Sequence, residues 1–190
     1  MGIETKKVEE IMIPLADYPH VQETATLKEA MKAMLECQLF VAGQGTLPRI
    51  VLIFNSAHEL AGMARRRDIM RGLEPEFLVS SPLQHRKAFF DVSTDANLPE
   101  LFFDRVVKGI KERSARKVSE VMLPLAVTIN HDDHIMKAIY EMVDKNQSLL
   151  PVLREGEVIG VVRSVDVFRE LSGLLFEPGE GPANCNNGAR

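Results

Sequence analysis

The chain has 190 residues, of which 45% are apolar and 26% are charged, and its formal net charge is −4. This composition is typical of a globular protein with one bilobal domain or two small ones. The net charge gives no support for nucleic-acid binding, which usually requires a basic face. No apolar run approaches the roughly 18–20 residues that a membrane span needs, so we expect no membrane span.

The first 73 residues predict a small α/β unit. After a flexible lead-in, residues 8–15 precede a short β-like run at 19–22. Apolar residues at helical spacing then predict an amphipathic helix that Thr24 or Thr26 could cap. Residues 42–48 should form a longer loop before a hairpin that joins a strand at 50–54 to one beginning at residue 60. The apolar stripe of the helix consists of Leu27, Ala30, Met31, Met34 and Leu35.

The second half of the chain repeats this pattern. Residues 118–125 match residues 8–15 without a gap, and an amphipathic helix with a similar stripe follows, which Asp132 or Asp133 could cap. A hairpin over 149–158 comes next. Both halves end in the same order of features: a strand that contains a glycine, then an arginine, an aspartate and a helix. The chain therefore contains an internal repeat. We place each aspartate, Asp68 and Asp166, at its helix N-cap.

Four segments follow from this repeat. We expect the first repeat at 6–73, an inserted linker at 74–117, the second repeat at 118–175, and a disordered Gly/Pro/Asn-rich tail at 177–190. The linker should contain a helix at about 98–113, with its apolar side chains on one face. Each repeat is a β-α-β-β-α unit that buries little apolar surface alone. The expected fold is therefore α/β (α+β), with two repeats packed sheet to sheet in pseudo-twofold symmetry.

The ordered motifs resemble paired CBS domains, also called a Bateman module. The resemblance rests on the Val-x-x-(Val/Ile)-Met-x-Pro opening of both repeats, the strand at 150–152, and the Gly-Val-Val-x-x-x-Asp-Val ending at 160–167. It covers about residues 6–73 and 116–175, and the second copy matches better. The inserted linker departs from the family, whose repeats are usually joined by a much shorter segment.

The resemblance implies an adenosine derivative bound in a cleft between the repeats. Asp68 and Asp166 match the aspartate that accepts hydrogen bonds from the ribose hydroxyls, although each could be only a helix cap. AMP, ADP or ATP would be a regulatory ligand, and no cofactor is obligatory. The base would lie against apolar wall residues whose motif positions match here: Ile13, Leu123, Ala126 and Pro151.

Two arginines depart from the family pattern. The family's usual Thr or Ser, three residues before the aspartate, is Arg65 in one copy and Arg163 in the other. An arginine there could pair with ligand phosphates, fill the site, or form an internal ion pair with a nearby acid. The run Arg65-Arg66-Arg67 could likewise be a solvated turn or a polyphosphate clamp.

No other pattern predicts chemistry. His131 and His134 are three residues apart and could share a helix face, but a metal needs three or four converging ligands, so we expect no metal site. The sequence has no nucleophile elbow and no Walker or Cys-x-x-Cys motif, so we expect no enzyme. Two cysteines do not indicate a disulfide framework, which favours a cytoplasmic location.

The leading hypothesis is a regulatory sensor that binds an adenine nucleotide and relays its bound state to an unidentified protein target. We expect a homodimer. The alternative is a ligand-free interaction module whose cleft Arg65 and Arg163 fill, and whose 74–117 segment docks a protein. The same segment could instead pad the outside of the module, form a dimer surface, or cover the cleft as a lid.

Overall fold

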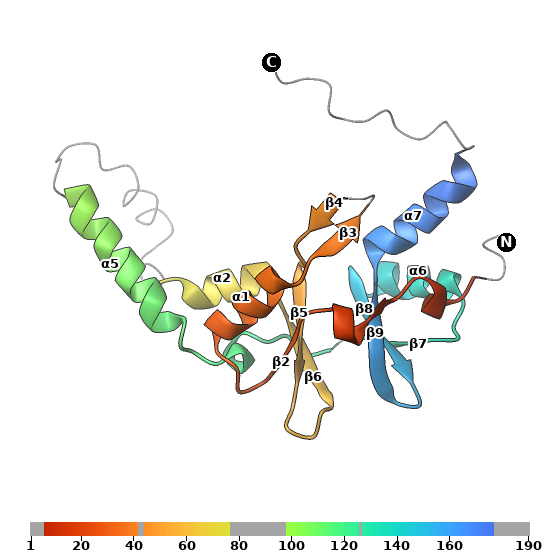
Figure 1. Ribbon diagram of the computed structural model, residues 1–190, viewed down its shortest axis with the longest axis horizontal. Helices are drawn as coiled ribbons and strands as arrows, with labels where there is room; N and C mark the ends of the chain where they lie inside the picture. The colour runs from red at the N-terminus through yellow and green to blue at the C-terminus, as the bar shows by residue number, and fades with distance from the viewer. Residues whose placement is uncertain (1–5, 42–43, 77–97, 126, 177–190) are drawn as a thin grey trace, which may run out of the picture. The chain divides into compact units, whose positions relative to one another are not determined.

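The computed structural model describes residues 6–41, 44–76, 98–125 and 127–176 (Figure 1). The expected tail and residues 77–97 of the linker lie outside the described residues. The chain divides into two compact units. We call them the terminal unit (Met1–Asp17 with Ala126–Arg190) and the central unit (Tyr18–Leu125).

The central unit is built on a three-stranded sheet. Strand β5 (Ile50–Phe54) lies between β2 (His20–Gln22), which is parallel to it, and β6 (Leu60–Arg65), which is antiparallel. Helices α1 (Leu27–Glu36) and α2 (Arg66–Leu73) supply the apolar side chains that pack on the sheet. The core consists of Leu27, Ala30, Met34, Val51, Ile53, Ala64, Ile69, Leu73 and Val118.

Two further elements belong to this unit. Strands β3 (Leu39–Val41) and β4 (Gln44–Thr46) form an antiparallel hairpin where the sequence predicts a loop. The Thr46 hydroxyl donates to the Leu39 carbonyl at 3.1 Å, and this bond supplements the short ladder. Helix α5 (Leu98–Arg113) lies in the inserted linker, and the one-turn helix η4 (Val118–Glu120) follows it.

The terminal unit repeats this plan. Its sheet has the order β1 (Ile13–Pro14), β9 (Glu157–Arg163), β8 (Leu149–Arg154) and β7 (Ile129–Asn130). Helices α6 (Ile135–Asp144) and α7 (Ser164–Leu175) pack on it, and two one-turn helices, η2 (Val8–Glu10) and η3 (Leu15–Asp17), flank β1. The core consists of Val8, Ile129, Ile135, Ala138, Met142, Leu150, Val152, Val162 and Val167.

The opening segments of the two repeats are exchanged between the units. Val8 opens the first repeat but is buried in the terminal unit, where its amide donates to the Asp133 carbonyl at 3.0 Å. Val118 opens the second repeat but is buried in the central unit, where its amide donates to the Ala25 carbonyl at 2.8 Å. Each unit therefore completes its core with residues from the other repeat.

A glycine in each repeat makes room for the exchanged segment. At Gly62, an added Cβ would lie 2.5 Å from the Leu123 carbonyl oxygen, and at Gly160 it would collide with the Ile13 carbonyl oxygen. These approaches accompany backbone pairing of Met63 with Leu123 and of β9 with β1. A side chain at either glycine would push the exchanged segment off the sheet edge.

Among the described helices, none combines the length and the apolar character that crossing a membrane would require.

We predict that Gly62→Ala lowers the free energy of unfolding by about 1–3 kcal/mol, because the added methyl group overpacks against a backbone that cannot rotate away. Gly160→Ala should behave alike. Gly173 is the matched control, because an added Cβ there meets nothing within 4 Å. Since it lies inside α7, Gly173→Ala should be neutral or stabilising by up to about 1 kcal/mol. Urea unfolding measures all three variants, and wild-type stability in Gly62→Ala would contradict the prediction.

Candidate functional site

The arginine and aspartate that end each repeat lie at a turn from strand to helix. Strand β6 runs through Arg65, and α2 begins at Arg66 with Arg65 as its N-cap residue. Likewise β9 runs through Arg163, which is the N-cap residue of α7. The prediction that Asp68 and Asp166 are the N-caps is therefore wrong, because each helix starts directly at the strand end and puts its aspartate at the third helical position.

The aspartate at this position pairs with the arginine of its own turn. Arg65 Nε and Nη2 donate to the two carboxylate oxygens of Asp68 at 2.6 and 3.0 Å. Arg163 donates to Asp166 in the same way, at 2.6 and 2.7 Å. Both are two-bond, fork-to-carboxylate contacts, a geometry that favours arginine over lysine. Of the three arrangements considered for these arginines, the structure contains the internal ion pair.

The two pairs differ in their exposure to solvent. The side chain of Asp68 is 5% exposed and that of Arg65 is 34% exposed, whereas those of Arg163 and Asp166 are 13% and 12% exposed. The Arg65 amide also donates to the Asp68 carboxylate at 3.1 Å, as in a capping box. The guanidinium of Arg65 is therefore accessible to water while its partner carboxylate is buried.

The charge state of Asp68 reflects this pairing. Burial alone would raise the pKa of Asp68, but the hydrogen bonds and positive charge of Arg65 outweigh it and hold the pKa below its ordinary value of 3.8. The hydrogen bond to Asp68 in turn raises the pKa of Arg65 above its ordinary value. The pair is therefore fully ionised at neutral pH.

An apolar row of three residues lies beside each ion pair. In the terminal unit, Val161 of β9 pairs with Ile13 on one side and with Pro151 on the other. Arg163 follows Val161 by two residues along the strand and so shares its face. The row and the Arg163–Asp166 pair thus belong to one side of one sheet.

The central unit has the same arrangement. Met63 pairs with Leu123 on one side and with Leu52 on the other, and Arg65 follows Met63 by two residues. Sequence reasoning missed Met63 and its counterpart Val161, although their spacing from the arginine marks them as same-face residues. Ala126, the remaining predicted wall residue, lies outside the described residues.

A protein-family model described as CBS domain matches residues 8–75 and 118–173, which together exceed half of the chain. The chain belongs to the CBS domain family. The resemblance found in the sequence motifs is therefore confirmed, together with the mixed α/β fold of two CBS repeats. A comparison with curated proteins finds no match.

Solved structures show the same fold. The CBS domain of a CBS domain containing membrane protein from Sphaerobacter thermophilus is 21% identical, with a TM-score of 0.61 over 88% of each chain. CBSX2 from Arabidopsis thaliana, in a complex with AMP, is 13% identical, with a TM-score of 0.56 over 90% of this chain and 98% of that one. The cytosolic domain of the Mg²⁺ channel MgtE, in a complex with ATP, is 19% identical, with a TM-score of 0.51 over 83% of this chain and 46% of that one.

The ion pair sets a condition on any ligand of these CBS aspartates. A ribose diol needs both carboxylate oxygens, and in each repeat both already accept hydrogen bonds from arginine. A diol that approaches the same edge of the carboxylate competes with the guanidinium, which, once displaced, needs another anion because an unpaired, partly buried charge is costly. A phosphate group offers that anion with matching geometry.

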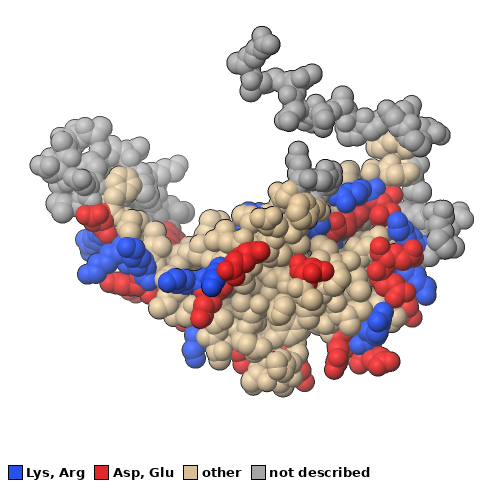
Figure 2. Space-filling model, in the orientation of Figure 1, with Lys and Arg blue, Asp and Glu red and all other residues tan. Residues whose placement is uncertain are grey.

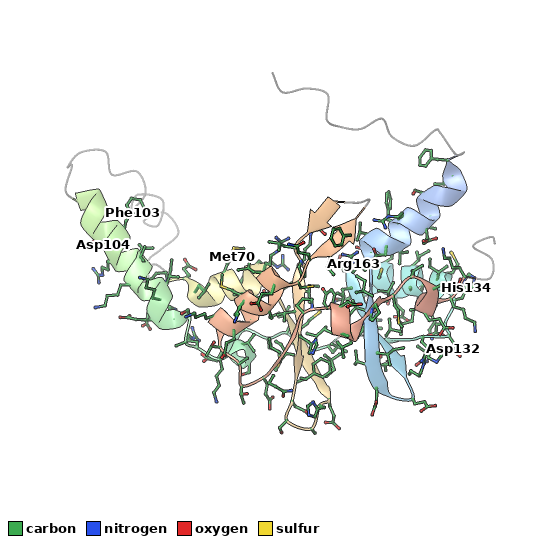
Figure 3. All side chains as sticks on the ribbon, viewed as in Figure 1. Met70, Phe103, Asp104, Asp132, His134 and Arg163 are labelled. Atoms are coloured by element: carbon green, nitrogen blue, oxygen red, sulfur yellow. The ribbon has the colours of Figure 1, made fainter. Side chains whose placement is uncertain are left out.

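The two histidines tested as metal ligands have other roles. The His131 ring nitrogen Nδ1 lies 3.1 Å from a Glu9 carboxylate oxygen, and His134 caps α6 by accepting from the Met136 amide at 3.2 Å (Figure 3). The expectation that Asp132 or Asp133 caps α6 is wrong, since Asp133 instead accepts from the Asn130 amide and from Lys137. Within the part of the chain that the structure describes, no three His, Cys, Asp or Glu side chains gather as metal ligands.

We predict that Asp68→Asn lowers the free energy of unfolding by about 1–3 kcal/mol at pH 7, because Arg65 loses its charged partner. Since the pKa of Asp68 is depressed in the folded protein, its stabilising effect is complete above 3.8 and fades as the pH falls through the folded pKa. The difference between variant and wild type should therefore shrink in acid. Urea unfolding at several pH values measures it.

Asp132→Asn is the control for this series, because Asp132 is exposed and should change stability by less than about 0.5 kcal/mol. A difference for Asp68→Asn that stays constant from neutral pH into acid would contradict the role given to the ion pair.

Proposed function

We propose that this CBS protein is a regulatory, non-catalytic module that binds an adenine nucleotide through Asp68 and Asp166. The observation that carries the proposal is the duplicated site: each repeat sets a carboxylate, an arginine fork and an apolar row on one sheet face. The AMP complex of CBSX2 and the ATP complex of MgtE support an adenine nucleotide as the ligand class. No cofactor is required, and AMP, ADP and ATP are the candidates.

Binding proceeds by an exchange of partners. The guanidinium of Arg65 or Arg163 leaves its aspartate and forks onto a ligand phosphate, while the carboxylate accepts the two ribose hydroxyls. The exchange keeps every charge paired, so its cost is the difference between two similar sets of charge-assisted hydrogen bonds. The base packs on the apolar row beside the aspartate that holds its ribose: the row with Ile13 and Pro151 in the terminal unit, or the row with Leu123 in the central unit.

This exchange gives the site its selectivity. Adenosine carries the ribose and the base but no phosphate, so it would break an ion pair and leave the arginine without an anion. Removing one partner of a partly buried charge pair is strongly unfavourable. Nucleotides with at least one phosphate should therefore bind much more tightly than adenosine.

The nucleotide regulates only if it prefers one conformation of the protein over another. A separate protein target and a homodimer are part of this proposal, with the protein in the cytoplasm. Exposed apolar side chains on α6 and α7 support such contacts, since surface patches of this kind often mark interaction sites. They include Tyr140, Val143, Phe168 and Leu175.

A second candidate function is a ligand-free interaction module. The ion pairs favour it, because each aspartate already has a charged partner with two hydrogen bonds of 2.6–3.0 Å. The two functions differ in one observable, which is whether nucleotides bind at all.

We predict that AMP, ADP or ATP raises the thermal stability of the protein, and that adenosine does not. At a concentration about 100 times the dissociation constant, the ligand should add about 2.7 kcal/mol to the free energy of unfolding. Asp166→Ala should reduce this shift, because it removes one carboxylate that holds ribose. Differential scanning fluorimetry with each compound measures the shifts. A wild-type protein that responds to none of them would support the interaction module instead.

We also predict that Arg163→Ala erases much of the preference for AMP over adenosine. The ratio of the two affinities should fall at least about tenfold, which corresponds to about 1.4 kcal/mol. The variant loses the phosphate contact and also frees Asp166 for the diol of adenosine. Arg169→Ala is the matched control, because Arg169 is exposed on the same helix. Isothermal titration calorimetry gives both affinities, and an unchanged ratio in Arg163→Ala would refute the exchange.

A further inference from the structure

The inserted helix α5 carries an exposed apolar stripe. Phe103, Val107 and Ile110 follow one another at intervals of four and three residues, which places them along one face of the helix. Their side chains are 55%, 47% and 38% exposed. Large apolar side chains that line one helix face in contact with water often mark an interaction surface. Figure 3 shows Phe103 on this helix.

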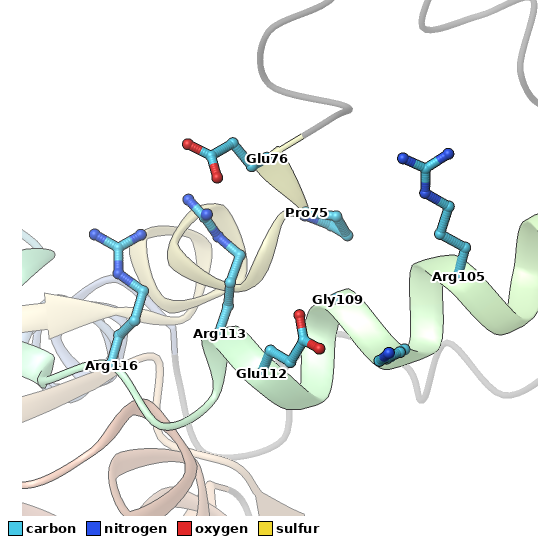
Figure 4. Close-up of a pocket in the computed structure, with 8 residues that line it drawn as sticks. Pro75, Glu76, Arg105, Gly109, Glu112, Arg113 and Arg116 are labelled. Carbon is cyan, nitrogen blue, oxygen red and sulfur yellow. The ribbon is translucent and has the colours of Figure 1, made fainter.

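The opposite side of α5 packs against the end of α2. Gly109 follows Val107 by two residues, which is about 200° round the helix, so it faces away from the stripe. A Cβ at Gly109 would lie 3.0 Å from the Pro75 Cβ, and the glycine therefore permits a close approach (Figure 4). Arg113 Nε also donates to the Gly72 carbonyl in the last turn of α2 at 3.3 Å. These contacts hold α5 with its apolar stripe directed away from α2.

Two opposite charges border the stripe on the same side. Asp104 directly follows Phe103, and Lys111 directly follows Ile110. The two charges are seven residues apart, which exceeds the spacing of three or four residues at which side chains of one helix pair. In the part of the chain that the structure describes, neither side chain forms an ion pair. Figure 2 shows acidic and basic side chains next to one another along α5, at the left of the view.

We propose that a second copy of this chain packs its α5 on this stripe in antiparallel orientation. With a two-fold axis near Val107, Asp104 of each copy lies opposite the partner's Lys111, so the charge pair forms twice. The apolar side chains fill the seam between the helices, and the flanking charges set their orientation, as in a coiled coil. A parallel pair would instead set like charges side by side. Because one helix carries both members of the charge pair, the partner that it fits is a second copy.

This surface gives the homodimer of the proposed function a contact, and it does not rest on nucleotide binding. A protein that ignores every nucleotide would still dimerise through α5, and a monomer would still bind a nucleotide, so the two proposals fail separately. Helix α5 has 16 residues and is about 24 Å long, so the contact is small and the dimer should dissociate on dilution. The exposed apolar side chains of α6 and α7 then remain for the protein target.

The first test is sedimentation equilibrium of the full chain at concentrations up to about 0.2 mM, which gives the dissociation constant of the dimer. Val107→Ala/Ile110→Ala should raise that constant at least about tenfold, because the dimer loses apolar contacts while alanine preserves the helix. Val143→Ala/Phe168→Ala is the matched control on α6 and α7, where the side chains are 76% and 72% exposed, and it should stay within about twofold of the wild type. A monomeric wild type, or an unchanged constant in the α5 variant, would overturn the proposal.

A second test exchanges the charges and checks the antiparallel orientation. Asp104→Lys and Lys111→Asp should each weaken self-association about tenfold, because each variant sets two pairs of like charges opposite one another. An equimolar mixture of the two variants should recover the wild-type affinity to within about threefold, because opposite charges face each other again in the heterodimer. Asp132→Lys, which reverses an exposed charge outside α5, should dimerise like the wild type. A mixture that associates no more tightly than either variant alone would overturn the proposal.

Discussion

The structure depends on the close approach of a backbone carbonyl to a glycine in each repeat. Gly62 admits Leu123, and Gly160 admits Ile13. Each approach lets the opening segment of one repeat join the sheet and the core of the other repeat. Neither repeat therefore completes its core from its own sequence. A single repeat of roughly 60 residues has little apolar surface to bury. The exchange therefore makes the stability of each unit depend on both repeats.

The same strand ends determine the chemistry of the candidate site. Because β6 and β9 pass directly into helices, arginine is the N-cap residue and aspartate lies three positions later, within reach of its fork. The pair is a built-in competitor for any ligand of the carboxylate. When the binding-competent state of a protein is only partly populated, the apparent affinity for the ligand is reduced by the populated fraction of that state. Under the proposed exchange, an arginine in place of the family's Thr or Ser would trade affinity for selectivity toward ligands that bring their own anion.

Sequence patterns predicted the repeat, the amphipathic helices and the family, because those features are periodic and occur twice. They could not place the helix starts. No glycine or proline marks the strand-to-helix junctions at Arg65-Arg66 and at Arg163-Ser164. The choice among three roles for the arginines required side-chain geometry. The exchange of opening segments joins residues far apart in the sequence, such as Val8 and Asp133 or Val118 and Ala25, and no local signal encodes it. The β3–β4 hairpin was missed because its glycines indicate a loop equally well.

Helix α2 links the proposed nucleotide site of the central unit to the inserted helix. Its first turn holds Asp68 against Arg65, and its last turn offers the Gly72 carbonyl to Arg113 of α5. Eight helical residues span only about 12 Å, so the two contacts are close together along the chain. A ligand that displaces Arg65 would therefore act on the helix whose other end contacts α5. If a change at the α5 end alters nucleotide affinity, thermodynamic linkage requires the nucleotide to influence that change by the same factor.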